Sequence, residues 1–187
     1  MYASDGLQNL FAAGAKLRLI SDVKTSLLMG DLLFAYGEIF IKLLVKVMPI
    51  RNVFEEINFR KEHYDLAQSE ISRILLTMTK INESAQPNNS VFKALSDSYR
   101  TQQDQAIKIA VERDALWHEH NSLQAAFSKD LLADLKLIEE RQLPVMIEIR
   151  REMDIESDGV AFEQQATFQR KRMDDLLDAL LSSLRKD

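Results

Sequence analysis

The sequence contains no cysteine, and this absence excludes several kinds of structure. Without thiols, the chain can form neither a disulfide framework nor a zinc site built on thiolates. Packing, hydrogen bonds and ion pairs must therefore hold the fold together. We expect a protein of a reducing compartment, and the cytoplasm is the simplest such location.

Glycine and proline are scarce as well. The 187 residues include five Gly and three Pro, whereas average usage is about 7% and 5%. Turns depend on these two residue types, so the sequence predicts few turns and long secondary-structure elements. The clearest loop signal is the segment ESAQPNNS at 83–90.

A long uncharged apolar run is also missing. Between Asp31 and Arg51, the most apolar part of the chain, the longest run without a charge is six residues. A transmembrane helix needs about 20 apolar residues, so no span is expected there. The N-terminus carries Asp5 where a secretory signal would be basic, which argues against a signal peptide.

The overall composition is that of a folded, acidic protein. Hydrophobic residues make up 46% of the chain and charged residues 28%, and the formal net charge is −5. This apolar content is too high for a disordered chain. The negative charge argues against nucleic acid as a partner.

The segment EIFIKLLVKVMP at 38–49 predicts a helix with a narrow polar stripe. Glu38, Lys42 and Lys46 are four residues apart and share one side of an α-helix, while large apolar residues fill the positions between them. Such a helix needs more than one apolar neighbour, as in a bundle or at a dimer interface. We predict that the dimer interface includes Leu32, Phe40, Leu44, Val47 and Trp117.

Prolines and loop signals organise the rest of the chain. Pro49 is expected to interrupt the first helix, and Asn52 with Glu55 has the spacing of a capping box that restarts it. Apolar residues then recur at helical spacing across a long segment in which Pro144 introduces a kink. The predicted helices span 4–48, 53–82, 91–155 and 160–185 of a single module, 1–187. The predicted fold is all-α: an elongated, dimeric bundle of long, kinked, coiled-coil-like helices.

Signatures of catalysis and of cofactor binding are absent from the sequence. It has no glycine-rich phosphate loop, no G-x-S-x-G and no Glu-x-x-His motif of a di-iron bundle. His118 and His120 flank Glu119, but two positions apart on a helix they point in different directions and cannot share a metal ion. We therefore predict a non-enzymatic protein without a metal or another cofactor.

Basic residues form clusters in spite of the acidic net charge. They are interpreted either as the solvated faces of long helices or as sites for anionic lipid, at about 1 kcal/mol per residue near a membrane surface. The amphipathic segment 7–20 is likewise either an ordinary first helix or a shallow membrane anchor. The candidate membrane-binding residues are Lys16, Arg18, Lys24, Arg150, Arg151, Arg170, Lys171 and Arg172.

The second half of the chain resembles the BAR superfamily. The segment ALSDSYRTQQDQAIKIAVERDALWHEHNSL, with Leu95, Tyr99, Arg100, Arg113 and Trp117, is similar to the second helix of sorting-nexin-type BAR domains. The segments IEIRREMD at 147–154 and FQRKRMDDLLDALLSSL at 168–184 resemble the entry to the third helix and the third helix itself. The resemblance covers about 91–185.

This resemblance implies a function based on shape and charge. It predicts a dimer, with a second copy or a related helical chain, that binds or senses curved anionic membranes in trafficking. The protein would then be cytoplasmic and peripheral on membranes. The alternative is a helical scaffold or adaptor that binds only protein partners through its apolar helix faces.

Overall fold

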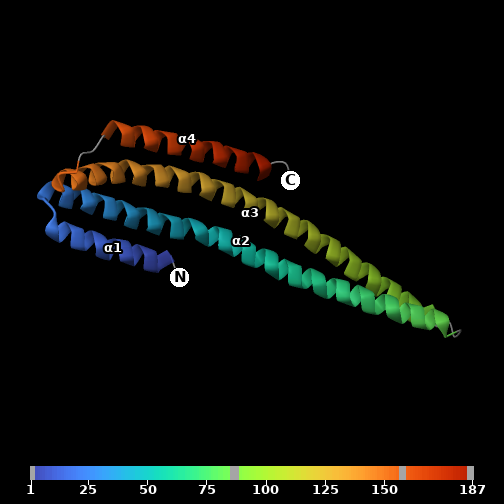
Figure 1. Ribbon diagram of the computed structural model, residues 1–187. Coiled ribbons are helices and arrows are strands. Elements are labelled where there is room, and N and C mark those ends of the chain that lie inside the picture. Colours follow the sequence, from blue (N-terminus) through green and yellow to red (C-terminus); the bar gives the residue numbers. More distant parts are fainter. Residues whose placement is uncertain (1–2, 85–88, 156–158, 185–187) are drawn as a thin grey trace. The chain divides into compact units, whose positions relative to one another are not determined.

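The computed structural model describes residues 3–84, 89–155 and 159–184, and its regular elements in these ranges are α-helices (Figure 1). Helices α2 and α3 hold 61 and 64 residues, which corresponds to about 92 and 96 Å at 1.5 Å per residue. The prediction of an all-α chain with long helices is therefore confirmed. The four helices are α1 (Ala3–Ile20), α2 (Val23–Glu83), α3 (Asn89–Glu152) and α4 (Gly159–Leu184).

The chain divides into two compact units. The first comprises Met1–Val47 and Ala125–Asp187, and the second comprises Met48–Gln124. In each unit a segment of α2 lies antiparallel to a segment of α3 (Figure 1). The first unit also contains α1, which lies along α2, and α4, which lies along α3.

The first unit is built around a core between α2 and α3. Leu33 of α2 also contacts Gly14 of α1 closely: a Cβ atom built on Gly14 would lie 2.6 Å from Leu33 Cδ1. The absence of a side chain at Gly14 thus lets α1 approach α2. The buried core residues of this unit are Met29, Leu32, Leu33, Ala35, Ile39, Ile138 and Val145.

The second unit is a hairpin of two helices with a narrow core. Two packed helices can each bury only one stripe of side chains, so many large apolar residues remain at the surface. Ile74 is fully buried, whereas Leu76, two positions along α2, is exposed. The other buried hydrophobic residues of this unit are Ile57, Ala67, Ala106 and Ile109.

Helix α2 runs through Pro49, so the predicted break between 48 and 53 is wrong. Proline removes one backbone donor and usually kinks or ends a helix. Here α2 contacts α3 on both sides of Pro49, through Lys46 with Asp130 and through Phe54 with Trp117. We attribute the continuity of the helix to this packing, which outweighs the local capping signal at Asn52.

The predicted first helix, 4–48, is instead divided at Ser21 and Asp22. Ser21 Oγ donates a hydrogen bond of 2.8 Å to the carbonyl of Leu17, which satisfies one acceptor at the end of α1. The backbone N–H of Asp22 donates to Glu152 Oε1 at 3.1 Å. This contact ties the α1–α2 turn to the last residue of α3.

The end of α3 has the hydrogen-bond pattern of a Schellman motif. The N–H of Ile155 donates to the carbonyl of Arg150 at 2.9 Å, and the N–H of Asp154 donates to that of Arg151 at 3.2 Å. Asp154 adopts a left-handed conformation, with φ 52°. α3 continues through Pro144 to Glu152, close to the predicted end at 155. The predicted turns at 83–90 and 156–159 lie partly outside the described residues.

Candidate interaction surfaces

Three lysines of α2 form ion pairs with carboxylates of α3 in the first unit. Lys24 Nζ lies 2.9 Å from Glu148 Oε2, Lys42 Nζ lies 2.6 Å from Asp134 Oδ1, and Lys46 contacts Asp130. The side chains of Glu148 and Asp134 are almost fully buried. Lys24, a candidate for lipid binding, is thus paired with Glu148, although its own side chain is 64% exposed.

The ion pairs change the acidity of two carboxyl groups. The hydrogen bond from Lys24 lowers the pKa of Glu148, and the nearby charge of Arg151 acts in the same direction. The hydrogen bond from Lys46 likewise lowers the pKa of Asp130. Both carboxylates are thus held in their charged form, which suits a structural ion pair better than an acid–base catalyst.

The second unit contains an aromatic cluster in place of a metal site. His120 is buried, and its ring lies 5.8 Å from that of Phe54 and 5.5 Å from that of Trp117. His118, by contrast, is exposed. Across the described ranges, no three His, Asp or Glu side chains gather where they could hold a metal ion.

The candidate lipid-binding residues of α3 and α4 fall into two separate groups. Arg170 Nε lies 2.9 Å from Oε2 of Glu139 on α3. Glu139 precedes Arg150 by eleven residues, which corresponds to about 17 Å along α3. Arg151 pairs with Glu148, and the guanidinium carbon of Arg150 lies 5.6 Å from the ring centroid of Phe162.

The remaining candidate lipid-binding residues are at the surface. Lys16, Lys171 and Arg172 are exposed. Arg18 is also exposed, and its Nε lies 3.5 Å from Ser26 Oγ. Within the described ranges, none of the four helices is both long enough and apolar enough to cross a bilayer.

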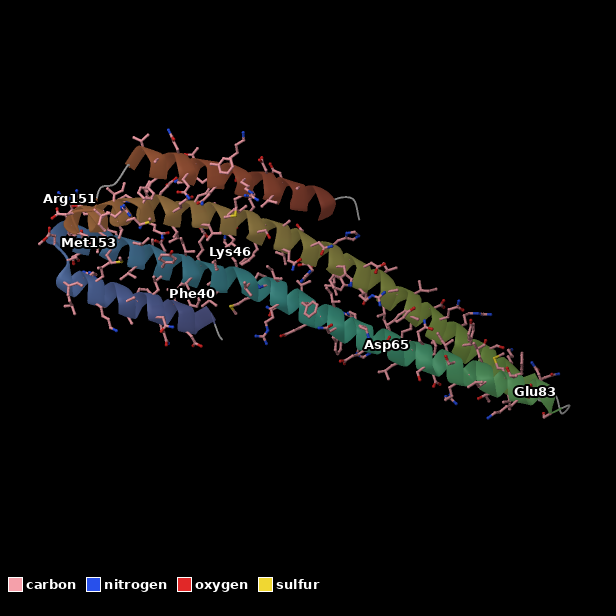
Figure 2. The ribbon with its side chains drawn as sticks, viewed as in Figure 1. Phe40, Lys46, Asp65, Glu83, Arg151 and Met153 are labelled. Carbon is pink, nitrogen blue, oxygen red and sulfur yellow. The ribbon has the colours of Figure 1, made fainter. Side chains whose placement is uncertain are left out.

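The predicted interface residues differ in how far they are available to a partner. Leu32 is only 5% exposed and belongs to the core of the first unit, so it does not face a second chain. Phe40 is half-buried and faces an apolar groove of about 370 Å³ between α1, α2 and α3 (Figure 2). Leu44, Val47 and Trp117 are exposed.

A stripe of large apolar residues on α2 is more exposed than these predicted residues. At 3.6 residues per turn its members lie within about 40° of one another on the helix, and Leu27, Phe34 and Ile41 follow one another at intervals of seven. Phe34, at the centre, is 71% exposed. Its members were not among the predicted interface residues, although the interval of seven is visible in the sequence. The α2 stripe consists of Val23, Leu27, Phe34, Ile41 and Val45.

A second exposed apolar cluster lies at the α1–α2 turn. Leu19 and Ile20, the last residues of α1, are 86% and 83% exposed, and Val23 follows directly after the turn. Through the contact between Asp22 and Glu152, the turn lies beside the end of α3, which is followed directly by the exposed Met153 (Figure 2).

Comparisons of the chain with protein-family models, with curated proteins and with solved structures gave no match.

Proposed function

We propose that this protein is a non-enzymatic assembly module that binds a second helical chain through its exposed apolar helix faces. The observation that carries the proposal is the α2 stripe, in which five large apolar side chains lie on one side of a single helix. Contiguous apolar surface of this kind marks an interaction site in most proteins. Leu27, Phe34 and Ile41 recur at intervals of seven residues, so they lie along one line of α2.

The energy available from this surface suits a stable complex. Burying one large apolar side chain contributes about 1.5–3 kcal/mol. Covering the α2 stripe on two chains would therefore contribute on the order of 10–20 kcal/mol, allowing for the part already buried. This is of the same order as the cost of association, which is about 4–15 kcal/mol.

Our more specific proposal is a BAR-like form of this assembly. Support comes from the two long helices, which run antiparallel within each unit, and from α4, which lies along α3 (Figure 1). The sequence resemblance over 91–185 points in the same direction. In this form the module would associate as a dimer and act through its shape and surface charge.

Analytical ultracentrifugation of the full chain at micromolar concentrations tests the proposal. We expect a dimer or larger species, which the double variant Phe34→Ser/Ile41→Ser shifts toward monomer. Phe168→Ser is the matched control, because Phe168 is as exposed as Phe34 but lies on α4. Circular dichroism verifies that all the variants keep their helical content. A wild-type chain that stays monomeric at tens of micromolar would contradict assembly with a second copy.

Peripheral binding to anionic membranes is a second candidate, and the α1–α2 turn is the observation in its favour. Leu19, Ile20 and Val23 present apolar surface beside the basic residues Lys16 and Arg18. Shallow insertion of apolar side chains combined with attraction between basic residues and anionic lipid is an established mode of membrane attachment.

Cosedimentation with vesicles of anionic phospholipid tests this second candidate. Binding is expected to weaken with added salt, because salt screens the charges. Leu19→Ser/Ile20→Ser should reduce binding, and Phe168→Ser should leave it unchanged. If the wild-type chain does not sediment with the vesicles, the membrane role is wrong and assembly with proteins alone remains.

A further inference from the structure

Helix α4 packs on α3 with little buried side-chain surface. Of the α4 side chains that the structure describes, Ala166 is the one that is buried, whereas the large residues Phe168 and Leu176 are 67% and 58% exposed. Helix α1, by contrast, packs Leu10 and Leu17 against the core of the first unit. Apolar packing therefore holds α4 less firmly than α1.

Two hollows border the seam between α3 and α4. Their volumes are about 230 and 270 Å³, and a water molecule has a share of about 30 Å³ in the liquid, so each hollow has room for several. Side chains on either side of such a space lose the contacts that close packing would give them. Gln142 of α3 and Gln169 of α4 line both hollows, and their amide groups can bond to water. Water can thus enter the seam at little cost.

Ion pairs supply the specific contacts between the two helices. Arg170 of α4 lies near two carboxylates of α3, with its Nε 2.9 Å from Glu139 Oε2 and its Nη1 3.8 Å from Glu140 Oε1. Four residues further along α4, Asp174 Oδ1 lies 2.7 Å from Lys136 Nζ. Sliding α4 by one turn would bring Arg170 to the level of Lys136, where like charges repel. These pairs therefore set the position of α4 along α3.

The ion pairs of α4 are more accessible to solvent than those between α2 and α3. The side chains of Arg170 and Glu139 are 29% and 30% exposed, and those of Lys136 and Asp174 are 39% and 47% exposed. Asp134, at the seam of α2 and α3, is only 6% exposed. Salt shortens the range of accessible charges from about 10 Å at 0.1 M to about 3 Å at 1 M. The attachment of α4 should therefore depend on ionic strength.

We infer that α4 is a strap that opens and closes on α3, with Arg170 and Asp174 as its two fastening residues. This inference concerns a conformational change within one chain and does not depend on the assembly proposed through the α2 stripe. The first turn of α4 stays tethered, because the ring of Phe162 lies 5.6 Å from the guanidinium carbon of Arg150. Opening therefore proceeds from the C-terminal end of α4.

Opening changes both the apolar and the charged surface of the first unit. In the closed form, Leu132 and Leu143 of α3 are partly buried and line the two hollows, and Arg170 is paired with Glu139. In the open form, α4 no longer covers these leucines. Arg170 also loses its carboxylate and joins the exposed Lys171 and Arg172 in a run of three cations. The closed strap thus conceals a surface that the open strap presents.

Hydrogen exchange of the full chain at 0.1 M and 1 M NaCl tests the inference. A released helix of 26 residues is only marginally stable by itself in water, so opening lets its amides exchange. We expect the α4 amides to exchange about tenfold faster at 1 M than at 0.1 M, most strongly beyond Arg170, because salt screens the fastening pairs. The α1 amides should change little. Exchange rates in α4 that are the same at both salt concentrations would overturn the inference.

Removal of the two fastening charges should have the effect of salt. Arg170→Gln/Asp174→Asn is expected to exchange its α4 amides at 0.1 M as fast as the wild type does at 1 M. Lys171→Gln/Asp175→Asn is the matched control, because it removes the same two charges from exposed neighbouring positions, and it should keep the wild-type rates. Equal rates in the two variants would show that Arg170 and Asp174 do not fasten α4.

The absence of cysteine allows the strap to be locked. Gln142→Cys/Gln169→Cys places one thiol on each side of the seam, and a disulfide requires Cα atoms within about 7 Å. The oxidised form is expected to lose the salt dependence of exchange in α4, whereas the reduced form of the same variant keeps it. An equal response to salt in the two forms would show that the response does not come from opening. A disulfide that fails to form on mild oxidation would show that α4 does not close on α3 at these positions.

Discussion

The ammonium group of Lys42 lies 2.6 Å from Oδ1 of Asp134, a carboxylate whose side chain is only 6% exposed. Lys24 with Glu148 and Lys46 with Asp130 repeat this arrangement along the same pair of helices. A shift of α2 along α3 would leave these carboxylates without their partners, and an unpaired buried charge is strongly destabilising. We interpret the three pairs as the feature that sets the register of α2 against α3 in the first unit.

The first prediction concerns the Lys42–Asp134 pair. Lys42→Met should lower the melting temperature by several degrees, because it leaves Asp134 buried without its cation. Lys42→Met/Asp134→Leu should recover much of the loss by removing that charge. Lys61→Met is the control, since Lys61 pairs with Asp65 on an exposed helix surface, where an ion pair contributes little. Thermal unfolding followed by circular dichroism measures all three effects, and equal losses in Lys42→Met and Lys61→Met would contradict the prediction.

The second prediction concerns the loss of folding stability at acidic pH. The pKa values of Glu148 and Asp130 are lowered in the folded chain from ordinary values of 4.5 and 3.8 by their lysine partners. The unfolded chain therefore takes up protons first as the pH falls. The stabilisation from the two ion pairs is complete at pH values above the ordinary pKa values of the carboxyl groups. It is lost as the pH falls from about 5 toward the lowered pKa values of the folded chain.

Urea unfolding across this pH range measures the effect. Glu148→Gln/Asp130→Asn should be less stable than the wild type near neutral pH, and its stability should change less on acidification. Glu62→Gln provides the control for removing an exposed carboxylate. If the free energy of unfolding falls with pH at the same slope in the double variant and the wild type, these two groups do not control the loss of stability in acid.

The third prediction concerns the end of α3. Asp154 has a φ of 52°, a conformation that costs glycine little but strains other residues. Its negative charge also lies near a helix C-terminus, where anions are unfavourable. Asp154→Gly should therefore stabilise the protein by about 0.5–1 kcal/mol, whereas Asp154→Val should destabilise it. Denaturant unfolding tests both, and a loss of stability in the glycine variant would contradict this account.

The sequence predicted the helical elements well where the signal was local. The scarcity of Gly and Pro and the apolar spacing after residue 91 predicted a long helix, and α3 spans Asn89–Glu152. The division at Ser21 and Asp22 was missed because the turn contains neither glycine nor proline. It is fixed in part by Glu152, which is 130 residues away, so no local pattern could reveal it.

The candidate surface could be predicted only in part, for a related reason. The apolar residues of 32–48 cover most of the helix, and the sequence does not say which of them face α3. The lysine–carboxylate pairs orient the helix so that Leu32 is buried and Phe34 is exposed. Which side of α2 is buried thus depends on the positions of Asp134 and Glu148, and these are known only when α3 is placed beside α2.

The fourth prediction concerns the approach of α1 to α2. Gly14→Leu should loosen α1, because its first side-chain carbon would lie 2.6 Å from Leu33 Cδ1, and Leu33 is itself buried in the core. Leucine is a better helix former than glycine by roughly 0.5–1 kcal/mol. A less stable α1 in this variant would therefore arise from packing alone. Hydrogen exchange of the α1 amides measures the change, and they should exchange faster in the variant.

Gly6→Leu is the matched control on the same helix, since a Cβ atom built on Gly6 has no neighbour within 4 Å. It should slow exchange in α1 or leave it unchanged, because the gain in helix propensity meets no clash. Equal exchange rates in the two variants would show that the close contact at Gly14 does not hold α1 in place.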